Sequence, residues 1–231
     1  MTGITAIIPA AGYGTRMGSS RNKQFMMLCG KPVLIHTLEV FENAVEVSRI
    51  IVITREDEVE YARNLICEYS FSKRITVISG GKERQNSVWN GLQKLTDDCT
   101  MVVVHDGARP LLLPQILQQA IAEAKLSAGV VVGVPVKDTI KKVDKDGIIV
   151  STPARAELWS VQTPQIFSKD ILVKAYTDAL DKGILATDDA ALVERLGISV
   201  KMVKGSYENI KITTQEDLLF AEAILRGRDK G

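Results

Sequence analysis

The chain has 231 residues, a formal net charge of +1 and charged side chains at 25% of its positions, which is ordinary for a globular enzyme. A charge so close to zero gives no reason to expect nucleic acid or a membrane as a partner, and no apolar run approaches the length of a membrane span. The three widely spaced cysteines fit reduced thiols in a cytoplasm, and two histidines exclude a His-rich metal centre. We therefore expect a cytoplasmic protein.

Short apolar runs alternate with helical patterns through the first 134 residues. We expect strands at about 4–8, 49–54, 75–78, 101–105 and 129–134, with helices at about 32–41, 56–69, 83–95 and 114–125. Continuously apolar strands that alternate with helices indicate an α/β fold: a three-layer sandwich around a mostly parallel, Rossmann-like sheet. We interpret residues 1–231 as one domain whose ligands bind beyond the carboxyl ends of the strands.

The pattern changes at Pro135. Residues 136–143 and 148–152 alternate around the turn signal Asp144–Gly147, which predicts a β-hairpin. An isolated hairpin buries little of itself, so we interpret residues 136–155 as an arm that packs on a second subunit of a homodimer. A surface hairpin folded back on its own domain is nearly as compatible with the pattern.

The remaining chain returns to the domain. We expect residues 162–165 in a loop, helices at about 169–180 and after Thr187–Asp189, a strand at 199–203 and a strand-like run at 208–212. Thr213–Glu216 has a capping-box pattern, which predicts the start of the last helix.

Residues 9–23, which follow the first expected strand, combine three glycines with the cations Arg16, Arg21 and Lys23. The spacing is not a dinucleotide-binding fingerprint, because Met17 stands where the third glycine belongs, and it is not a Walker loop, because Gly18 is followed by serine. Exposed backbone N–H groups together with fixed cations suit a triphosphate and the extra charge of a pentacovalent phosphorus. The alternative is a βα turn with solvated basic residues. The stretch resembles the loop of sugar-nucleotide pyrophosphorylases and related nucleotidyltransferases.

Weaker signals follow the later strands. Asp106, at the end of the fourth strand, suits a ribose hydroxyl or a phosphate-bound Mg²⁺, although an ion pair with Arg109 across the turn is an alternative. His105 is better interpreted as a buried, hydrogen-bonded residue than as a base. The backbone and Ser87 of the stretch 80–87 suit the polar edge of a base, whereas Lys211 alone is better interpreted as solvated.

The sequence contains no evident motif for covalent or acid–base catalysis: no Ser-His-Asp set, Cys-His pair or pair of catalytic carboxylates stands out. A reaction without a protein nucleophile fits direct nucleotidyl transfer, in which a substrate phosphate attacks and the enzyme supplies positioning and charge neutralisation.

In their order and spacing, these motifs resemble the 2-C-methyl-D-erythritol 4-phosphate cytidylyltransferase family of the non-mevalonate isoprenoid pathway. The resemblance covers essentially the whole chain. The stretches that carry it are Ile8–Met17, Asn22–Phe25, Gly80–Val88, His105–Pro110, Val134–Lys141, Gln162–Gln165, Thr187–Asp189 and Asn209–Thr213.

The resemblance implies transfer of CMP from CTP to 2-C-methyl-D-erythritol 4-phosphate with Mg²⁺, giving 4-diphosphocytidyl-2-C-methyl-D-erythritol and pyrophosphate by direct attack of the substrate phosphate on the α-phosphorus. It implies four catalytic residues: Arg16, Lys23, Arg155 and Lys211. It implies CTP contacts at Ala10, Ala11, Gly12, Gly14, Gly81, Ser87 and Asp106, the last also a metal ligand. It implies polyol phosphate contacts at Arg109, Asp138, Thr139 and Thr163.

In the family, the arms exchange across a homodimer, so the resemblance implies that Arg155 serves the partner's active site. One departure is Lys82, where relatives often carry an acidic residue, and this leaves the role of its side chain open. Two other functions remain as alternatives. A ribitol-5-phosphate cytidylyltransferase is disfavoured by the stretch Val134–Thr139 and by Ala108, and a non-catalytic nucleotide-binding homologue is disfavoured by the intact Arg16, Lys23 and Asp106.

Overall fold

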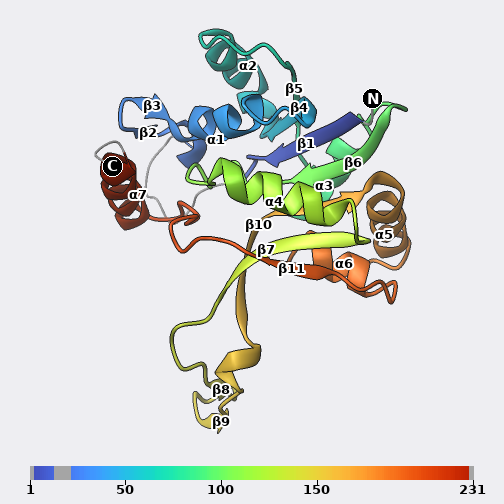
Figure 1. Ribbon diagram of the computed structural model, residues 1–231, viewed down its shortest axis with the longest axis vertical. Coiled ribbons are helices and arrows are strands. Elements are labelled where there is room, and N and C mark those ends of the chain that lie inside the picture. The colour runs from blue at the N-terminus through green and yellow to red at the C-terminus, as the bar shows by residue number, and fades with distance from the viewer. Residues whose placement is uncertain (1–2, 13–21, 229–231) are drawn as a thin grey trace.

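The computed structural model describes residues 3–12 and 22–228, and a seven-stranded sheet is its centre (Figure 1). The strand order is β11-β7-β10-β6-β1-β4-β5. All neighbouring pairs are parallel except those of β10, which is antiparallel to both β6 and β7. The strands are β1 (Gly3–Pro9), β4 (Val47–Thr54), β5 (Arg74–Ser79), β6 (Cys99–Val104), β7 (Gly129–Pro135), β10 (Trp159–Ser168) and β11 (Lys201–Lys204). The predicted α/β fold with a mostly parallel sheet is confirmed.

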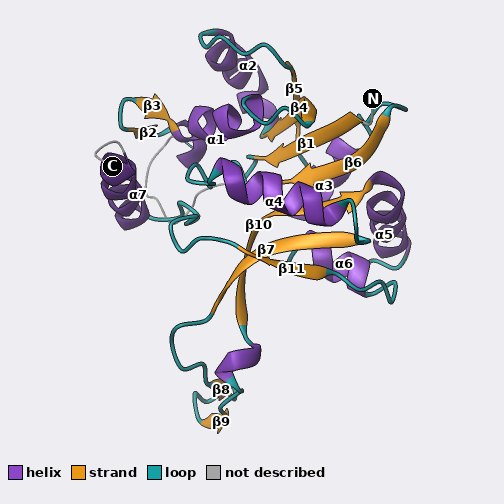
Figure 2. Cartoon of the chain, in the orientation of Figure 1, coloured by secondary structure: helices purple, strands orange, loops and turns teal. Residues whose placement is uncertain are grey.

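Helices cover both faces of this sheet (Figure 2). On one face lie α1 (Val33–Glu42), α2 (Val59–Cys67) and α4 (Pro114–Ala124). On the other lie α3 (Arg84–Leu92), α5 (Lys169–Asp181) and α6 (Asp189–Glu194). Alternation along β1 explains both cores, because Ala6 and Ile8 point into the first and Ile7 into the second. Burying such an aliphatic side chain contributes roughly 1.5–3 kcal/mol.

A third, smaller core lies at the side of the sandwich. There α7 (Gln215–Arg228) packs through Ala221 on Leu28, Val33 and Ile212, beside the small hairpin of β2 (Met27–Leu28) and β3 (Lys31–Pro32). Among the described residues, no helix is long and apolar enough to cross a membrane.

The loops that follow β1, β4, β5 and β6 meet at one edge of the sheet. Backbone hydrogen bonds continue the strand pairing past the strand ends: Ala10 N–H donates to the Ile53 carbonyl at 2.7 Å, and Gly107 N–H donates to the Pro9 carbonyl at 3.0 Å. Gly80 N–H likewise donates to the Thr54 carbonyl at 2.7 Å. The loops that contain Ala10, Gly80 and Gly107 therefore share one edge, as parallel strands require.

The arm leaves the same edge, between β7 and β10, and extends away from the sandwich (Figure 1). Its two strands, β8 (Lys142–Val143) and β9 (Ile149–Ser151), pair over fewer residues than expected, and a short 3-10 turn at Arg155–Glu157 precedes β10. Ile148 and Val150 are 65% and 61% exposed. The predicted projecting hairpin is confirmed, and the alternative of a hairpin folded back on its own domain is wrong.

Three local predictions were wrong. Residues 162–165, expected in a loop, lie within β10, where the pairing with β7 is irregular between Val161 and Gln165. Residues 208–212, expected to be strand-like, form no strand because no neighbouring strand pairs with them. The last helix is capped one residue later than expected, since Thr214 and Asp217 hydrogen-bond reciprocally rather than Thr213 and Glu216.

Candidate functional site

A cavity of about 280 Å³ lies at the edge where the strand-end loops meet. Its walls come from the loop after β1, the turn after β5, the turn after β6 and the segment before α7. The lining residues are Pro9, Ala11, Gly12, Lys23, Gln24, Gly81, Lys82, Glu83, Arg84, Ser87, Asp106, Ala108 and Lys211. Small side chains and cations make up most of this lining. Such a lining suits a nucleoside triphosphate.

A second cavity of about 290 Å³ adjoins the first. It is lined by Arg84, Asp106, Arg109, Val161, Gln162, Thr163, Gln165, Thr187, Asp188 and Lys211. Arg84, Asp106 and Lys211 line both cavities, so the two hollows meet at these three side chains. Two ligands, one in each cavity, would face each other across them.

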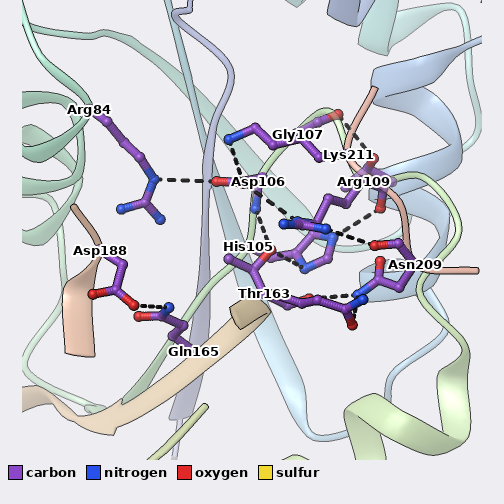
Figure 3. Close-up of polar contacts among 12 residues, drawn as sticks. Arg84, His105, Asp106, Gly107, Arg109, Thr163, Gln165, Asp188, Asn209 and Lys211 are labelled. Atoms are coloured by element: carbon purple, nitrogen blue, oxygen red, sulfur yellow. Dashed lines mark hydrogen bonds and ion pairs between the residues drawn. The ribbon is translucent and has the colours of Figure 1, made fainter. Parts of the chain in front are cut away.

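Asp106 is the centre of this junction (Figure 3). Its carboxylate lies 2.8 Å from Lys211 Nζ, 3.3 Å from Arg84 Nε and 3.6 Å from Arg109 Nε. Burial opposes ionisation of Asp106, but the three cations outweigh it and hold its pKa well below the ordinary value. The cluster therefore stays ionised, and its cations outnumber the carboxylate they surround.

Arg84 is held in place by Asp189, a residue of α6. Its two terminal nitrogens donate to the Asp189 carboxylate at 3.1 and 2.8 Å, and the Tyr176 hydroxyl donates to the same carboxylate. Burial works against the charged form of Arg84, but Asp189 and Asp106 outweigh it and raise its pKa. Such a bidentate pair holds the guanidinium plane rigidly at the junction.

The turn after β5 shapes one wall of the first cavity. Ser87 Oγ accepts a hydrogen bond from Gly81 N–H at 3.1 Å and donates to the Glu83 carbonyl at 3.1 Å. A Cβ at Gly81 would lie 2.4 Å from the Asn86 Cβ, so glycine is required there by close packing. On the opposite wall, the buried Gln24 amide donates to the Ala10 carbonyl.

His105 is fully buried under this wall, and both of its ring nitrogens are hydrogen-bonded. Burial lowers the pKa of His105 to about 4, so the ring is neutral at physiological pH. The prediction that His105 is a buried, hydrogen-bonded residue is confirmed.

Most of the predicted site residues converge here. Those lining one or both cavities are Ala11, Gly12, Lys23, Gly81, Ser87, Asp106, Arg109, Thr163 and Lys211, and Ala10 is buried beside them. Arg16 and Gly14 lie outside the described residues. Asp138, Thr139 and Arg155 are exposed on the arm and line neither cavity of their own chain; Arg155 Nη1 donates to the Lys137 carbonyl at 3.0 Å.

Several residues of the site were not among the predicted ones. Arg84 by its sequence context alone is either a functional residue or a surface cation, and its partner Asp189 lies 105 positions away in sequence. Thr187 and Asp188 belong to a stretch that carries the family resemblance, but no site role was predicted for them; Asp188 also caps α6 by accepting from Ala191 N–H. Their position beside the Gln162–Gln165 stretch of β10 depends on a strand that local pattern did not reveal.

Known proteins resemble this chain over nearly its whole length. The family model described as 2-C-methyl-D-erythritol 4-phosphate cytidylyltransferase matches residues 4–227. A protein of that description from Caldanaerobacter subterraneus is 48% identical over 224 residues, covering 96% of this chain and 99% of its own. One from Geotalea uraniireducens is 50% identical over 226 residues, covering 96% of this chain and 97% of its own. The crystal structure of 4-diphosphocytidyl-2C-methyl-D-erythritol synthase from Anaerococcus prevotii superposes with a TM-score of 0.87 at 33% identity, covering 97% of this chain and 96% of that one.

Proposed function

Since the chain belongs to the 2-C-methyl-D-erythritol 4-phosphate cytidylyltransferase family and has that activity in the non-mevalonate isoprenoid pathway, we propose that the two adjoining cavities are its substrate sites. The first cavity holds CTP and the second holds the polyol phosphate. The single observation that carries this assignment is the junction, where Arg84, Asp106 and Lys211 line both cavities at once.

The chemistry follows from that junction. An oxygen of the polyol phosphate attacks the α-phosphorus of CTP, a new P–O bond forms, and the bond to pyrophosphate breaks with its electrons on the leaving group. The attacking phosphate is already ionised, so no protein base is needed. Lys23 and Lys211 line the first cavity. Together with Arg16, whose role the family resemblance implies, they neutralise the charge that accumulates on the pentacovalent phosphorus, and the cavity walls hold the two phosphates in line.

Nucleotide choice comes from the small residues of the first cavity. Ala11 and Gly12 on one side, with Gly81 and Ser87 on the other, leave room for a pyrimidine and offer mostly main-chain hydrogen-bonding groups. Main-chain carbonyls accept from the cytosine amino group, which uracil lacks, and a buried carbonyl left unpaired disfavours UTP.

Magnesium fits this site through one protein ligand. Among the described residues, no group of three or more acidic, histidine or cysteine side chains could hold a metal ion. Mg²⁺ in nucleotide sites takes one or two carboxylates and completes its shell with phosphate oxygens and water. Asp106 offers such a carboxylate, and the Lys211 side chain beside it is 38% exposed and can move aside. A bound Mg²⁺ would neutralise charge on the triphosphate.

The arm completes the site in this proposal. Residues 1–231 act as one nucleotidyltransferase domain, and the arm of each subunit of a homodimer brings Asp138, Thr139 and Arg155 to the polyol phosphate of its partner. The exposed apolar side chains of the arm, among them Ile148 and Val150, support a second copy as their cover. A cytoplasmic location rests on the cysteines, of which Cys29, Cys67 and Cys99 are all free thiols.

Narrowing each cavity separately tests the assignment. Pyrophosphate release is measured with CTP and with either methylerythritol phosphate or ribitol phosphate. Ala11 lines the first cavity but not the second, and Thr187 lines the second but not the first. Ala11→Leu should raise KM for CTP at least tenfold, and Thr187→Leu should raise KM for the polyol phosphate. The reverse pattern would contradict the assignment, and a preference for ribitol phosphate would contradict the proposed fit of the second cavity to methylerythritol phosphate.

A further inference from the structure

A short chain of hydrogen bonds, which we call the His105 relay, lies directly behind the junction (Figure 3). His105 Nε2 is 3.0 Å from the Arg109 carbonyl oxygen, and His105 Nδ1 is 3.1 Å from Thr163 Oγ1. Thr163 Oγ1 in turn is 3.0 Å from the backbone nitrogen of Asp106. The relay joins the turn after β6 to the irregular stretch of β10.

The direction of every bond in the relay follows from its partners. A carbonyl oxygen can only accept, so His105 Nε2 carries a ring proton. The ring is 0% exposed and its partners are a carbonyl and a hydroxyl rather than a carboxylate, so it carries one proton and Nδ1 is an acceptor. The Thr163 hydroxyl must then donate to Nδ1, and it accepts from Asp106 N–H. The hydroxyl has one hydrogen, which the protein already uses, so it cannot donate to a ligand in the second cavity even though Thr163 lines that cavity.

A second connection ties the same segments together. Asn209 Nδ2 donates to the Thr163 carbonyl at 2.9 Å, and the Asn209 carbonyl accepts from Arg109 Nη1 at 2.7 Å. His105, Thr163 and Asn209 are 0–4% exposed, so none of these bonds competes with water. The backbone beneath Asp106 is thereby held from two sides.

We propose that His105 and Thr163 are positioning residues for the cytidylyl transfer: the relay fixes the backbone of Asp106 and so places the carboxylate around which the three cations gather. The inference rests on the proposed role of that junction. It differs from the family-based expectation for Thr163, because the hydroxyl hydrogen is used within the protein and is not available to the phosphate group of the substrate.

Kinetics of matched Thr163 variants test the relay. Thr163→Val keeps the shape but removes the hydroxyl, and we expect kcat to fall about tenfold, the effect of one lost hydrogen bond, while both KM values change less than about twofold. Thr163→Ser should restore most of kcat. Thr177→Val, the same change on the exposed face of α5, is the control and should leave kcat unchanged.

His105 variants extend the test. His105→Gln places a donor near the Arg109 carbonyl but offers Thr163 no acceptor at the Nδ1 position. If the relay works as one unit, the double variant with Thr163→Val should be no slower than the slower single variant. Multiplication of the two single effects would overturn the relay.

A measurement on the unmodified enzyme does not depend on the variants folding. The chain has two histidines, so ¹⁵N spectra with a His36→Gln variant for assignment identify the ring nitrogens of His105. We expect a protonated Nε2 and an unprotonated Nδ1 whose signal shifts in Thr163→Val and returns in Thr163→Ser. A protonated Nδ1 would overturn the proposal.

Asp106→Asn separates this inference from the proposed function. Full activity in Asp106→Asn would contradict the proposed junction, and with it the functional part of the relay. Loss of activity in Asp106→Asn together with unchanged kcat and raised KM for the polyol phosphate in Thr163→Val would overturn the relay alone, because the hydroxyl would then bind substrate directly.

Discussion

Lys23 and Asp106 differ in how each becomes part of the candidate site. Lys23 begins a short 3-10 turn, Lys23–Phe25, and reaches the first cavity from the end of the glycine-rich stretch. Asp106 has its charge set by three cations from different parts of the chain. A local motif therefore suffices to recognise the first residue, whereas the electrostatic environment of the second exists only in the folded chain.

Removal of the Lys23 ammonium should affect the transition state more than the bound substrate. We expect Lys23→Met to lower kcat about a hundredfold or more, as for loss of one preorganised donor to developing charge, with KM for CTP changed much less. Steady-state pyrophosphate release measures both constants. Lys182→Met, on a surface ion pair with Asp178, is the matched control. A normal kcat in Lys23→Met would contradict a role for this lysine in the reaction.

At the scale of elements, α7 shows how a helix end positions a site residue. Its N-terminus is capped by Asp217, which accepts from Thr213 N–H at 2.8 Å and from Thr214 N–H at 2.9 Å. The segment just before it contains Lys211, and Ile212 packs under the helix with Leu28. Fraying of this cap would loosen the segment that delivers Lys211 to the junction.

The cap also has a pH dependence whose sign is determined. Burial opposes ionisation of Asp217, but the hydrogen bonds from Thr213 and Thr214 outweigh it and lower its pKa. A carboxylate with a lowered pKa stabilises the fold above its unfolded-state pKa, about 3.9, and loses that contribution as the pH falls through the folded-state value. The free energy of unfolding that depends on Asp217 should therefore decrease in acid.

Asp217→Asn tests that dependence. We expect the variant to lose about 1 kcal/mol of unfolding free energy at pH 7, the usual effect of removing a helix cap, and to approach the parent protein in strong acid. Urea denaturation at both pH values measures the difference. Asp170→Asn, an exposed acid in the first turn of α5, is the control and should lose less. A difference between Asp217→Asn and the parent that is the same at both pH values would contradict the role of the charge.

The molecule consists of a compact sandwich and an arm whose apolar side chains no other part of residues 3–12 and 22–228 covers (Figure 1). The base of the arm is nevertheless tied to the site: Tyr207 donates to the Pro135 carbonyl at 2.7 Å, and Lys137 Nζ lies 3.6 Å from the centre of the Tyr207 ring. Tyr207 lies in the loop that leads from β11 to Asn209 and Lys211. Packing of the arm on a second copy would thus act close to the junction.

Subunit mixing tests whether the sites are shared. In the proposed homodimer, Arg155→Ala and Lys23→Ala should each be inactive alone, but a mixed dimer contains one complete site. Random exchange of equal amounts makes half the dimers mixed, so activity should recover to about a quarter of the parent level. Sedimentation first establishes the dimer and the exchange. A monomer, or no recovery after confirmed exchange, would contradict the shared site while leaving the nucleotide chemistry intact.

The sequence by itself determined the layered α/β fold and most of the first cavity. Apolar runs such as Ile50–Ile53 and Val102–Val104 indicate strands locally. Because the carboxyl ends of parallel strands share one edge of a sheet, the sequence alone also predicts that motifs far apart in the chain lie close together. The motif order also carried the family resemblance that the comparisons bear out.

Only the tertiary structure decided what surrounds Asp106. The partners Arg84 and Asp189 come from α3 and α6, and their pairing depends on how two helices dock on one face of the sheet rather than on local periodicity. Thr163 reaches His105 because β10 runs antiparallel beside β6. The polar stretch Gln162–Gln165 within β10 does not have the apolar pattern that predicts a strand. Ion pairs and hydrogen bonds between distant segments depend on distances that exist only after folding, and the burial that makes them strong does not exist in the unfolded chain.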